Sequence, residues 1–219
     1  MFFTPRFFTF FQQLEKNNNK PWFDAHRDDY ETHVKAPFRA FVTKIIEELV
    51  AQGEAVNTNP SKAIFRINRD IRFSKDKSPY KNNVGAIFAK GGTTDNGVGY
   101  YMHLGAKEIF VGGGWYQPGK EELIKIRQEI YYNNADFSAL VNNKTFRSTF
   151  GTVQGETNKM IPSEYKDFLV EQPLIANKQF YYMKALTKED VLSRNFDKTV
   201  LKIFSAGRPL NQFLAGAIA

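Results

Sequence analysis

The chain has 219 residues, no cysteine and a net charge of +7, with 42% hydrophobic, 15% aromatic and 24% charged residues. This composition favours an ordered globular protein, and the missing thiols exclude disulfides, thiolate nucleophiles, iron–sulfur clusters and cysteine-based zinc sites. Because no signal-peptide pattern and no run of roughly 18 apolar residues occurs, we expect a cytoplasmic protein with no membrane partner.

The first 58 residues carry helical patterns. Pro5 begins a helix predicted to end near residue 16, and Pro21 begins a second helical stretch that runs to Tyr30. We expect Pro37 to divide this stretch from the next helix, which covers residues 34–49. The apolar face of that helix is predicted to be core and comprises Val34, Phe38, Phe41, Val42, Ile45, Ile46 and Leu49.

From Ala63 the apolar residues recur at every second position, which is typical of an extended segment with one buried face. Arg69 falls on the apolar side and therefore predicts a bulge or a turn between two short strands. The two sides are Phe65, Ile67, Ile71 and Phe73 on the buried one, and Arg66, Asn68, Asp70 and Arg72 on the other.

Three strands and then several helices follow. Strands are predicted at 84–90, 98–104 and 108–115, with a turn at 91–97 between the first two, and together they predict an antiparallel meander. Helices are predicted at 123–133 and 137–141, whereas residues 144–175 have an irregular pattern. A strand at 180–186 precedes Thr187–Asp190, which begins further helix to the chain's end.

These elements predict a single α+β domain over residues 1–219. Residues 1–58 would be helical, 59–117 rich in sheet, and 118–219 helical with one returning strand. We expect a central antiparallel sheet with N-terminal and C-terminal helices packed on it.

Positive charge is concentrated in residues 62–81, which hold seven cationic and two acidic side chains. Because guanidinium groups match phosphate and carboxylate oxygens, we predict a pocket for a small phosphorylated or other anionic ligand. Four cations would contact the anion, two carboxylates would orient them, and a tyrosine would serve as a wall or hydroxyl donor. The predicted ligand-binding residues are Arg66, Asp70, Arg72, Ser74, Asp76, Lys77, Tyr80 and Lys81.

Two other interpretations stay open. The same charges could pair internally, with Asp70 and Asp76 fixing a long loop, which would suit a protein–protein adaptor with exposed aromatic residues. Aromatic residues beside a basic segment are also typical of single-strand nucleic-acid binders, although no assembled RNA-binding motif is present. The aromatic residues concerned are Tyr80, Tyr100, Tyr101, Trp115 and Tyr116.

Three further patterns carry less information. Gly112–Gly114 predicts either a pocket floor beneath Trp115 and Tyr116 or close packing of a helix across the sheet. Residues 91–94 have the wrong order for a phosphate loop and predict a hairpin turn. The histidines His26, His33 and His103 lack ligand spacing, so we expect no metal and no cofactor.

The run from Phe65 to Lys81 also resembles the signature of the domain of unknown function 2461 family. The resemblance rests on Phe65-Arg66, Asp70-x-Arg72-Phe-Ser-Lys-Asp76-Lys77-Ser-Pro79-Tyr80-Lys81, Phe8 to Leu14, Trp22-Phe23 with Tyr30, Gly99-Tyr-Tyr101, Gly112-Gly113, and Pro209 to Leu214. It covers nearly the whole chain. It implies family membership but no activity, cofactor or catalytic residue.

Overall fold

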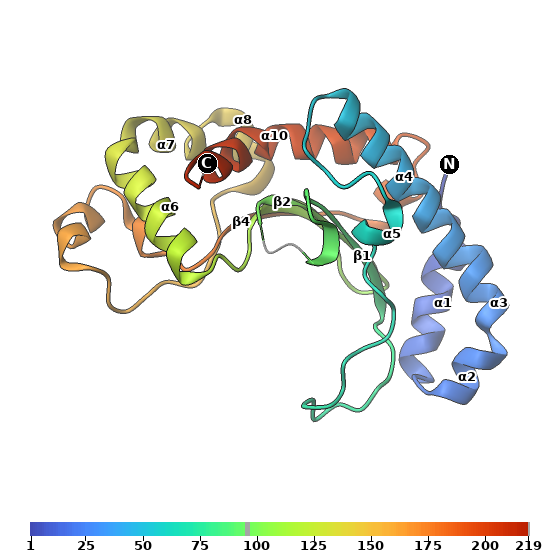
Figure 1. Cartoon of the computed structure of the whole chain (residues 1–219). Coiled ribbons are helices and arrows are strands. Elements are labelled where there is room, and N and C mark those ends of the chain that lie inside the picture. Colours follow the sequence, from blue (N-terminus) through green and yellow to red (C-terminus); the bar gives the residue numbers. More distant parts are fainter. Residues whose placement is uncertain (95–96, 219) are drawn as a thin grey trace. The chain divides into compact units, whose positions relative to one another are not determined.

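The computed structural model describes residues 1–94 and 97–218 and has a mixed α+β fold. Its antiparallel sheet has four strands in the order β1-β2-β3-β4, and N-terminal and C-terminal helices contact it (Figure 1). The predicted fold class and meander are thereby confirmed. The strands are β1 (Asn83–Phe88), β2 (Gly99–Gly105), β3 (Ile109–Trp115) and β4 (Phe180–Ala185).

The chain divides into two compact units. Unit 1 comprises Met1–Thr94, Tyr101–Val111 and Ala185–Leu201, and unit 2 comprises Asp95–Tyr100, Gly112–Lys184 and Lys202–Ala219. The boundaries fall after Thr94, within β2, within β3, within β4 and within the helix α10 (Phe196–Gly216). The single domain over residues 1–219 stays a prediction.

Unit 1 has a core of phenylalanine rings. The ring of Phe41 stacks on Phe196 with centroids 4.8 Å apart, and Phe3 packs edge-on against Phe7 at 4.9 Å. The predicted first helix is confirmed, because the phenylalanine-rich face between Pro5 and Lys16 is buried. The helices are α1 (Pro5–Lys16), α2 (Lys20–Ala25), α3 (Arg27–Tyr30), α4 (Ala36–Ala51), α5 (Pro60–Ala63) and α9 (Lys188–Val191).

The expected break at Pro37 is wrong. A π-helical turn, η1 (Glu31–Lys35), joins α3 to α4, and the backbone N–H of Ala36 donates to the carbonyl of Glu31. The widened turn accommodates a residue that lacks an N–H and would crowd the preceding turn of an α-helix. The helical path therefore continues through Pro37, and the predicted core residues Phe38, Phe41, Ile45 and Leu49 are all buried.

Unit 2 is mostly helical. The irregular pattern predicted for residues 144–175 misses one helix, α8, whose first backbone N–H groups donate to the side chain of Asn143. Short 3-10 turns occupy part of the remainder, and Arg127, only 5% exposed, fixes it by donating to the carbonyls of Ile175 and Asn177. The helices lying wholly in this unit are α6 (Lys120–Tyr132), α7 (Asn134–Val141) and α8 (Lys144–Phe150).

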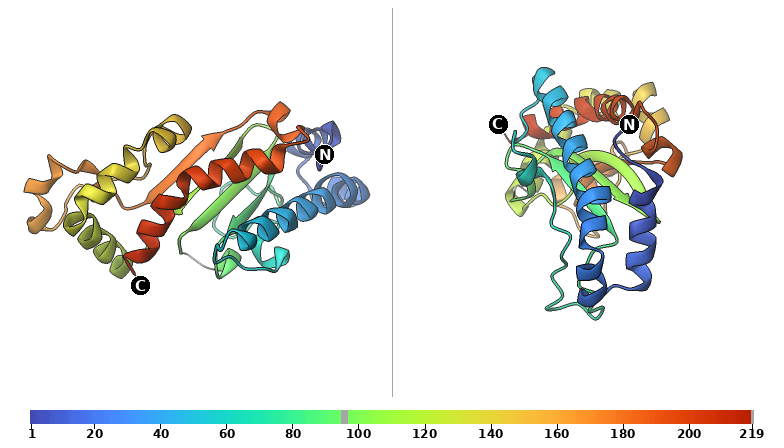
Figure 2. Two further views of the ribbon diagram at one scale, coloured as in Figure 1. Left: turned by 90° about the horizontal axis from the view of Figure 1, so that it is seen from above. Right: turned by 90° about the vertical axis from the view of Figure 1, so that its right-hand side faces the viewer.

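The glycine run in β3 is explained by close packing within unit 2. A Cβ atom at Gly112 or Gly114 would collide with the backbone of β4, and one at Gly113 would collide with the side chain of Tyr182. The Tyr182 ring lies between Gly113 and Gly207 of α10 and donates its hydroxyl to Asn211 at 3.0 Å. Crowding by the neighbouring strand therefore accounts for Gly112 and Gly114, whereas Gly113 makes room for the Tyr182 ring on which α10 packs. Figure 2 shows α10 running along the strands.

No helix in the described part of the chain is long and apolar enough to cross a membrane. The predicted turn at 91–97 contains a 3-10 turn, η2 (Gly92–Thr94), while residues 95 and 96 lie outside the described residues.

Candidate functional site

The basic segment forms a two-stranded ribbon in unit 1, which we call the basic ribbon (residues 65–82). Figure 1 shows it as a long excursion between α5 and β1. Its two arms are joined near the sheet by a bond from Phe65 N to Gly85 O, and farther out by bonds from Lys81 N to Ile67 O and from Arg69 N to Pro79 O. The period of two in the sequence therefore corresponds to real antiparallel pairing over the first half of the segment.

The bulge or turn expected at Arg69 is not there, because Arg69 N still pairs with Pro79 O. One residue separates Phe65 from Ile67 on the first arm, whereas three separate Lys81 from Gly85 on the second. The additional residues are therefore on the second arm, at residues 82–84. Arg69 instead keeps its backbone in the pairing and directs its side chain into the loop, where it pairs with Asp76 and donates to the carbonyl of Ser78 at 3.1 Å.

Residues 70–77 form the tip of the ribbon, where both carboxylates are paired. Arg72 donates twice to Asp70, at 3.0 and 2.7 Å, and Asp76 accepts from Arg69 and from the backbone and hydroxyl of Ser78. The Ser78 groups and then Arg69 lower the pKa of Asp76 to about 2. At the tip, the charges thus follow the ion-pair interpretation.

The predicted burial of Phe73 is wrong, because its side chain is 95% exposed. Pairing between the arms ends at Arg69 and Pro79, so the alternation of buried and exposed sides has no structural basis beyond them. The guanidinium carbon of Arg72 lies 5.8 Å from the Phe73 ring centroid. The tip therefore presents an aromatic ring beside cations.

Tyr80 fixes the ribbon to the N-terminal helices. It is 6% exposed and stacks on Phe23 of α2 with centroids 4.0 Å apart. The side chain of Asn18 bonds both backbone groups of Tyr80, at 2.9 and 3.1 Å. In this position Tyr80 packs the ribbon against α2. Its predicted role as a wall or hydroxyl donor of an anion pocket stays a prediction.

The base of the ribbon faces a row of aromatic residues on the sheet. Alternation in β2 directs Tyr100, Met102 and Leu104 into the core, and Tyr101 and His103 to the opposite face. There the His103 ring stacks on Phe110 of β3 at 4.6 Å, and Tyr101 lies about 6 Å from both Phe110 and Phe65. We call Phe65, Lys81, Tyr101, His103 and Phe110 the sheet-face cluster.

Two cations lie near this cluster, and neither is in an ion pair among the described residues. Lys81 is half-buried with its ammonium 5.4 Å from the Phe65 ring centroid, and Arg66 lies close enough to influence it. Burial, and then the charge of Arg66, lower the pKa of Lys81. Among residues 1–94 and 97–218, no ion pair joins either cation to an acid. Arg72 and, to a smaller extent, Arg66 lower the pKa of Asp70, so the positive charge at the base is balanced only in part.

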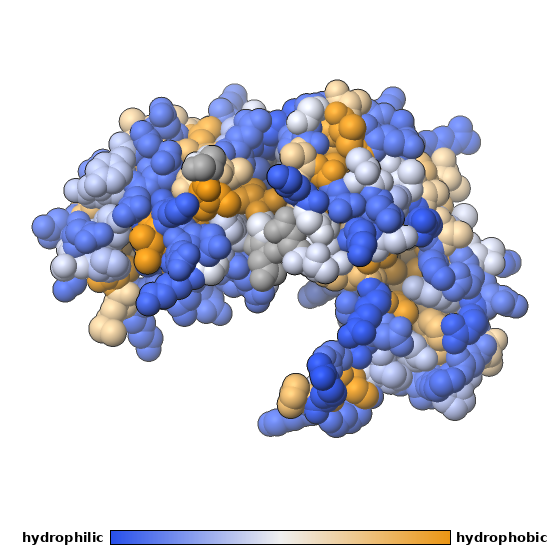
Figure 3. All heavy atoms as spheres, viewed as in Figure 1, coloured by the Kyte–Doolittle hydropathy of each residue, from blue (hydrophilic) through white to orange (hydrophobic). Residues whose placement is uncertain are grey.

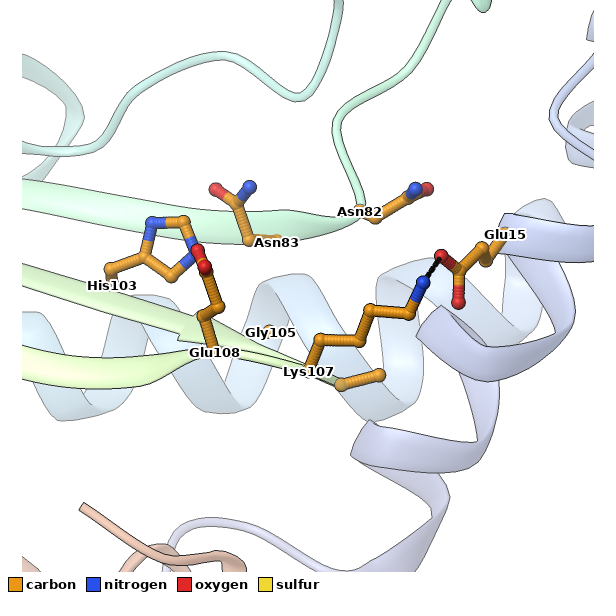
Figure 4. Close-up of a pocket in the computed structure, with 8 residues that line it drawn as sticks. Glu15, Asn82, Asn83, His103, Gly105, Lys107 and Glu108 are labelled. Atoms are coloured by element: carbon orange, nitrogen blue, oxygen red, sulfur yellow. Dashed lines mark ion pairs between the residues drawn. The ribbon is translucent and has the colours of Figure 1, made fainter. Parts of the chain in front are cut away.

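His103 links the sheet-face cluster to a hollow in unit 1. Figure 4 shows His103 and Asn83 lining it from adjacent strands, with the Glu15–Lys107 ion pair at its other side. Burial lowers the pKa of His103, Glu108 opposes this effect, and Lys81 adds to it. The hollow measures about 190 Å³, and its lining is Glu15, Asn82, Asn83, His103, Gly105, Ala106, Lys107 and Glu108.

Comparison with protein families identifies the chain. The model for the family described as "Conserved hypothetical protein (DUF2461)" matches residues 6–213. The chain belongs to the DUF2461 family. Comparisons with curated proteins and with solved structures gave no match.

For this DUF2461 chain, the structure brings the predicted residues together in separate groups. Ser74 and Asp76 meet around Arg69, Asp70 pairs with Arg72, and Lys77 donates to the carbonyl of Ile71. Arg66 and Lys81 lie together at the base. No ligand role of the eight predicted residues is tested by these contacts.

The sequence interpretation did not include His103, Phe110 or Asn83 among the ligand-binding residues. A signal for His103 existed, because the period of two in residues 99–105 places Tyr101 and His103 on one face. Only the fold places that face beside the ribbon. Among the described residues no group of three or more histidines, aspartates or glutamates could hold a metal, and the expectation of no metal stays a prediction.

Proposed function

We propose that this DUF2461 member binds a small phosphorylated or otherwise anionic ligand at the base of the basic ribbon, between Arg66 and Lys81 and against His103. Arg66 supplies a planar guanidinium that suits two anion oxygens, and Lys81 supplies a partly desolvated ammonium. The observation that carries the proposal is a half-buried lysine under the influence of an arginine, with no ion pair for either among the residues that the structure describes.

Electrostatics supports the base over the tip. Holding Lys81 half-buried beside Arg66 costs free energy, because burial and like charge both disfavour the ammonium form. A bound anion would remove this cost. At the tip, by contrast, Asp70 and Asp76 already neutralise Arg72 and Arg69.

The neighbouring groups suit a ligand that carries an apolar or polar part in addition to its anionic group. Tyr101 and the exposed edge of the His103–Phe110 stack offer apolar surface next to the cations, and Asn83 offers an amide in the adjoining hollow. His103 and Asn83 can each donate a hydrogen bond to an anionic or polar oxygen. The roles that the sequence predicts for Arg72 and Lys77 as anion contacts stay predictions and are not part of the site proposed at the base.

Thermal melts with inorganic phosphate test the proposal. At 10-fold excess over the dissociation constant, one site stabilises the folded state by about 1.4 kcal/mol, or roughly 3–6 °C for a chain of this size. We expect this shift for the wild type and its loss in Lys81→Met, which keeps an apolar stem over Phe65 but removes the charge.

Lys75→Met is the matched control, since it removes the same charge from the exposed tip. Without phosphate, Lys81→Met should melt at or slightly above the wild-type temperature, because an unpaired, half-buried charge has been removed. An equal phosphate shift in wild type and Lys81→Met would refute the site at the base. A much lower melting temperature for Lys81→Met would instead indicate that its charge is a structural partner.

A further inference from the structure

The tip of the basic ribbon displays one aromatic ring in solvent. Phe73 is 95% exposed, the highest value among the large apolar side chains of the described residues. The guanidinium carbon of Arg72 lies over the ring, 5.8 Å from its centroid. Burying a phenylalanine is favourable, so a fully exposed ring on a loop that could fold over it requires a reason.

The loop is constrained so that the ring stays exposed. Arg69 bonds Asp76, the carbonyl of Ser78 and, at 3.4 Å, the hydroxyl of Ser74. Lys77 donates to the carbonyl of Ile71 at 3.0 Å, which closes the other side of the tip. These bonds join residues before Phe73 to residues after it and so hold the loop in place. Binding of a partner would therefore not cost the entropy of ordering the loop.

Positive charge runs along the whole ribbon. Lys75 and Lys77 lie at the tip, and Arg66 and Lys81 lie at the base. The acids Asp70 and Asp76 are each paired with an arginine, so these four cations retain their charge. Cations beside an exposed ring suit the phosphates of a polyanion as well as its bases.

We propose that the ribbon tip is a binding surface for single-stranded nucleic acid, in which Phe73 stacks on a base and the ribbon lysines contact phosphates. Every base offers a flat face, so one exposed ring gives a contact that does not depend on sequence. The contact at Phe73 is tested separately from the anion site at the base, whose cations Arg66 and Lys81 would extend the same surface.

An anionic membrane is the competing partner for a basic tip with one exposed aromatic residue. A single ring gains little from the bilayer, and the residues that flank it, Arg72, Ser74 and Lys75, are polar. The cations at the base would also lie away from a bilayer that the tip contacts. Figure 3 shows the end of the ribbon as mostly hydrophilic, with only a small hydrophobic area.

Fluorescence anisotropy with a labelled oligothymidylate of about 15 nucleotides tests the inference. We expect binding to the wild type that weakens steeply with salt, and a loss of roughly 5- to 100-fold in affinity for Phe73→Ala. The variant should fold normally, because the ring packs against almost nothing. Phe73→Tyr should retain most of the affinity.

Tyr132→Ala is the control, since it removes another exposed aromatic ring, 77% exposed, from unit 2. Its oligonucleotide affinity should equal that of the wild type. Phe73→Ala should also keep the full melting shift with phosphate, which separates this inference from the site at Arg66 and Lys81.

Three outcomes would overturn the inference. They are absence of oligonucleotide binding at low salt, equal affinity of the wild type and Phe73→Ala, and tighter binding of duplex than of single strand. Sedimentation with vesicles of phosphatidylglycerol and phosphatidylcholine tests the alternative that the tip binds a membrane. If Phe73→Ala loses vesicle binding but keeps oligonucleotide binding, the tip is a membrane contact and the proposal is wrong.

Discussion

Two regions stand out in the sequence, the glycine run of β3 and the basic ribbon, and the structure accounts for them differently. A Cβ atom at any of the residues Gly112–Gly114 would collide with the backbone of β4 or with the side chain of Tyr182. In the ribbon, the contacts account for Arg69, Arg72 and both aspartates, but within the described part of the chain no ion pair joins Arg66 or Lys81 to an acid.

The difference shows how an unusual sequence pattern can be assigned to packing or to function. Packing explains the glycines completely, so no pocket has to be invoked beneath Trp115. The ribbon is explained only in part, and the unexplained charges are the ones we assign to ligands. Each of the following predictions tests one side of this comparison.

The largest effect is expected at Gly207→Ala. The new methyl group would collide with the Tyr182 ring, which is fully buried between Gly113 and α10 and contacts Phe150 at 4.4 Å. Overpacking of this kind costs about 1–3 kcal/mol or more, which exceeds the gain of up to about 1 kcal/mol from better helix propensity. Denaturant melts measure the difference.

Gly216→Ala is the matched control for this prediction. A Cβ atom there has no neighbour within 4 Å, so stability should stay the same or rise slightly. Equal stability of Gly207→Ala and Gly216→Ala would show that packing does not explain the glycines.

A smaller effect is expected for Arg72→Ala, which breaks the pair with Asp70 at the tip. Because that pair is exposed, stability in denaturant melts should fall only slightly. The phosphate-induced shift in melting temperature should largely remain. A loss of several kcal/mol would mean that the ribbon is a structural staple, and loss of the phosphate shift would move the anion site to the tip.

The smallest effect concerns pH. The pKa of His103 is lowered by burial, so His103 is neutral at pH 7.5 and gains charge only as the pH falls below the usual value of 6.5. Its protonation should therefore cost stability in acid, and sulfate at the base should offset that cost. We expect the sulfate-induced shift to be about 1–2 °C larger at pH 5.5 than at pH 7.5.

Sulfate keeps the same charge between pH 5.5 and pH 7.5, so a pH dependence of the shift must come from the protein. His103→Gln therefore serves as the control variant. The variant should show the same sulfate shift at both pH values. If the wild type shows no such pH dependence, His103 does not face the bound anion.

The sequence predicted elements whose pattern is long and regular. Residues 34–49 were assigned as a helix because seven apolar residues share one face, and all seven are buried in the structure. The sequence also predicts the three strands of the meander and a helix that begins at Thr187–Asp190 from local patterns. The structure contains these strands, and a capping box at Thr187 begins α9.

The errors arose where a residue's environment is set by distant parts of the chain. Pro37 was expected to end a helix, but a π-helical turn accommodates it. Phe73 has the right parity for burial, yet no second strand pairs with the chain at that point. The approach of His103 to Lys81 depends on how the ribbon folds back on the sheet, which no local pattern reveals.

The central claim is that an anion binds at the base of the ribbon. A crystal of the wild type soaked in selenate would locate the anion by its anomalous scattering. The account predicts a selenate ion within hydrogen-bonding distance of both Arg66 and Lys81, on the side that faces His103. Selenate bound only at the tip, or no ordered selenate on the ribbon at all, would contradict it.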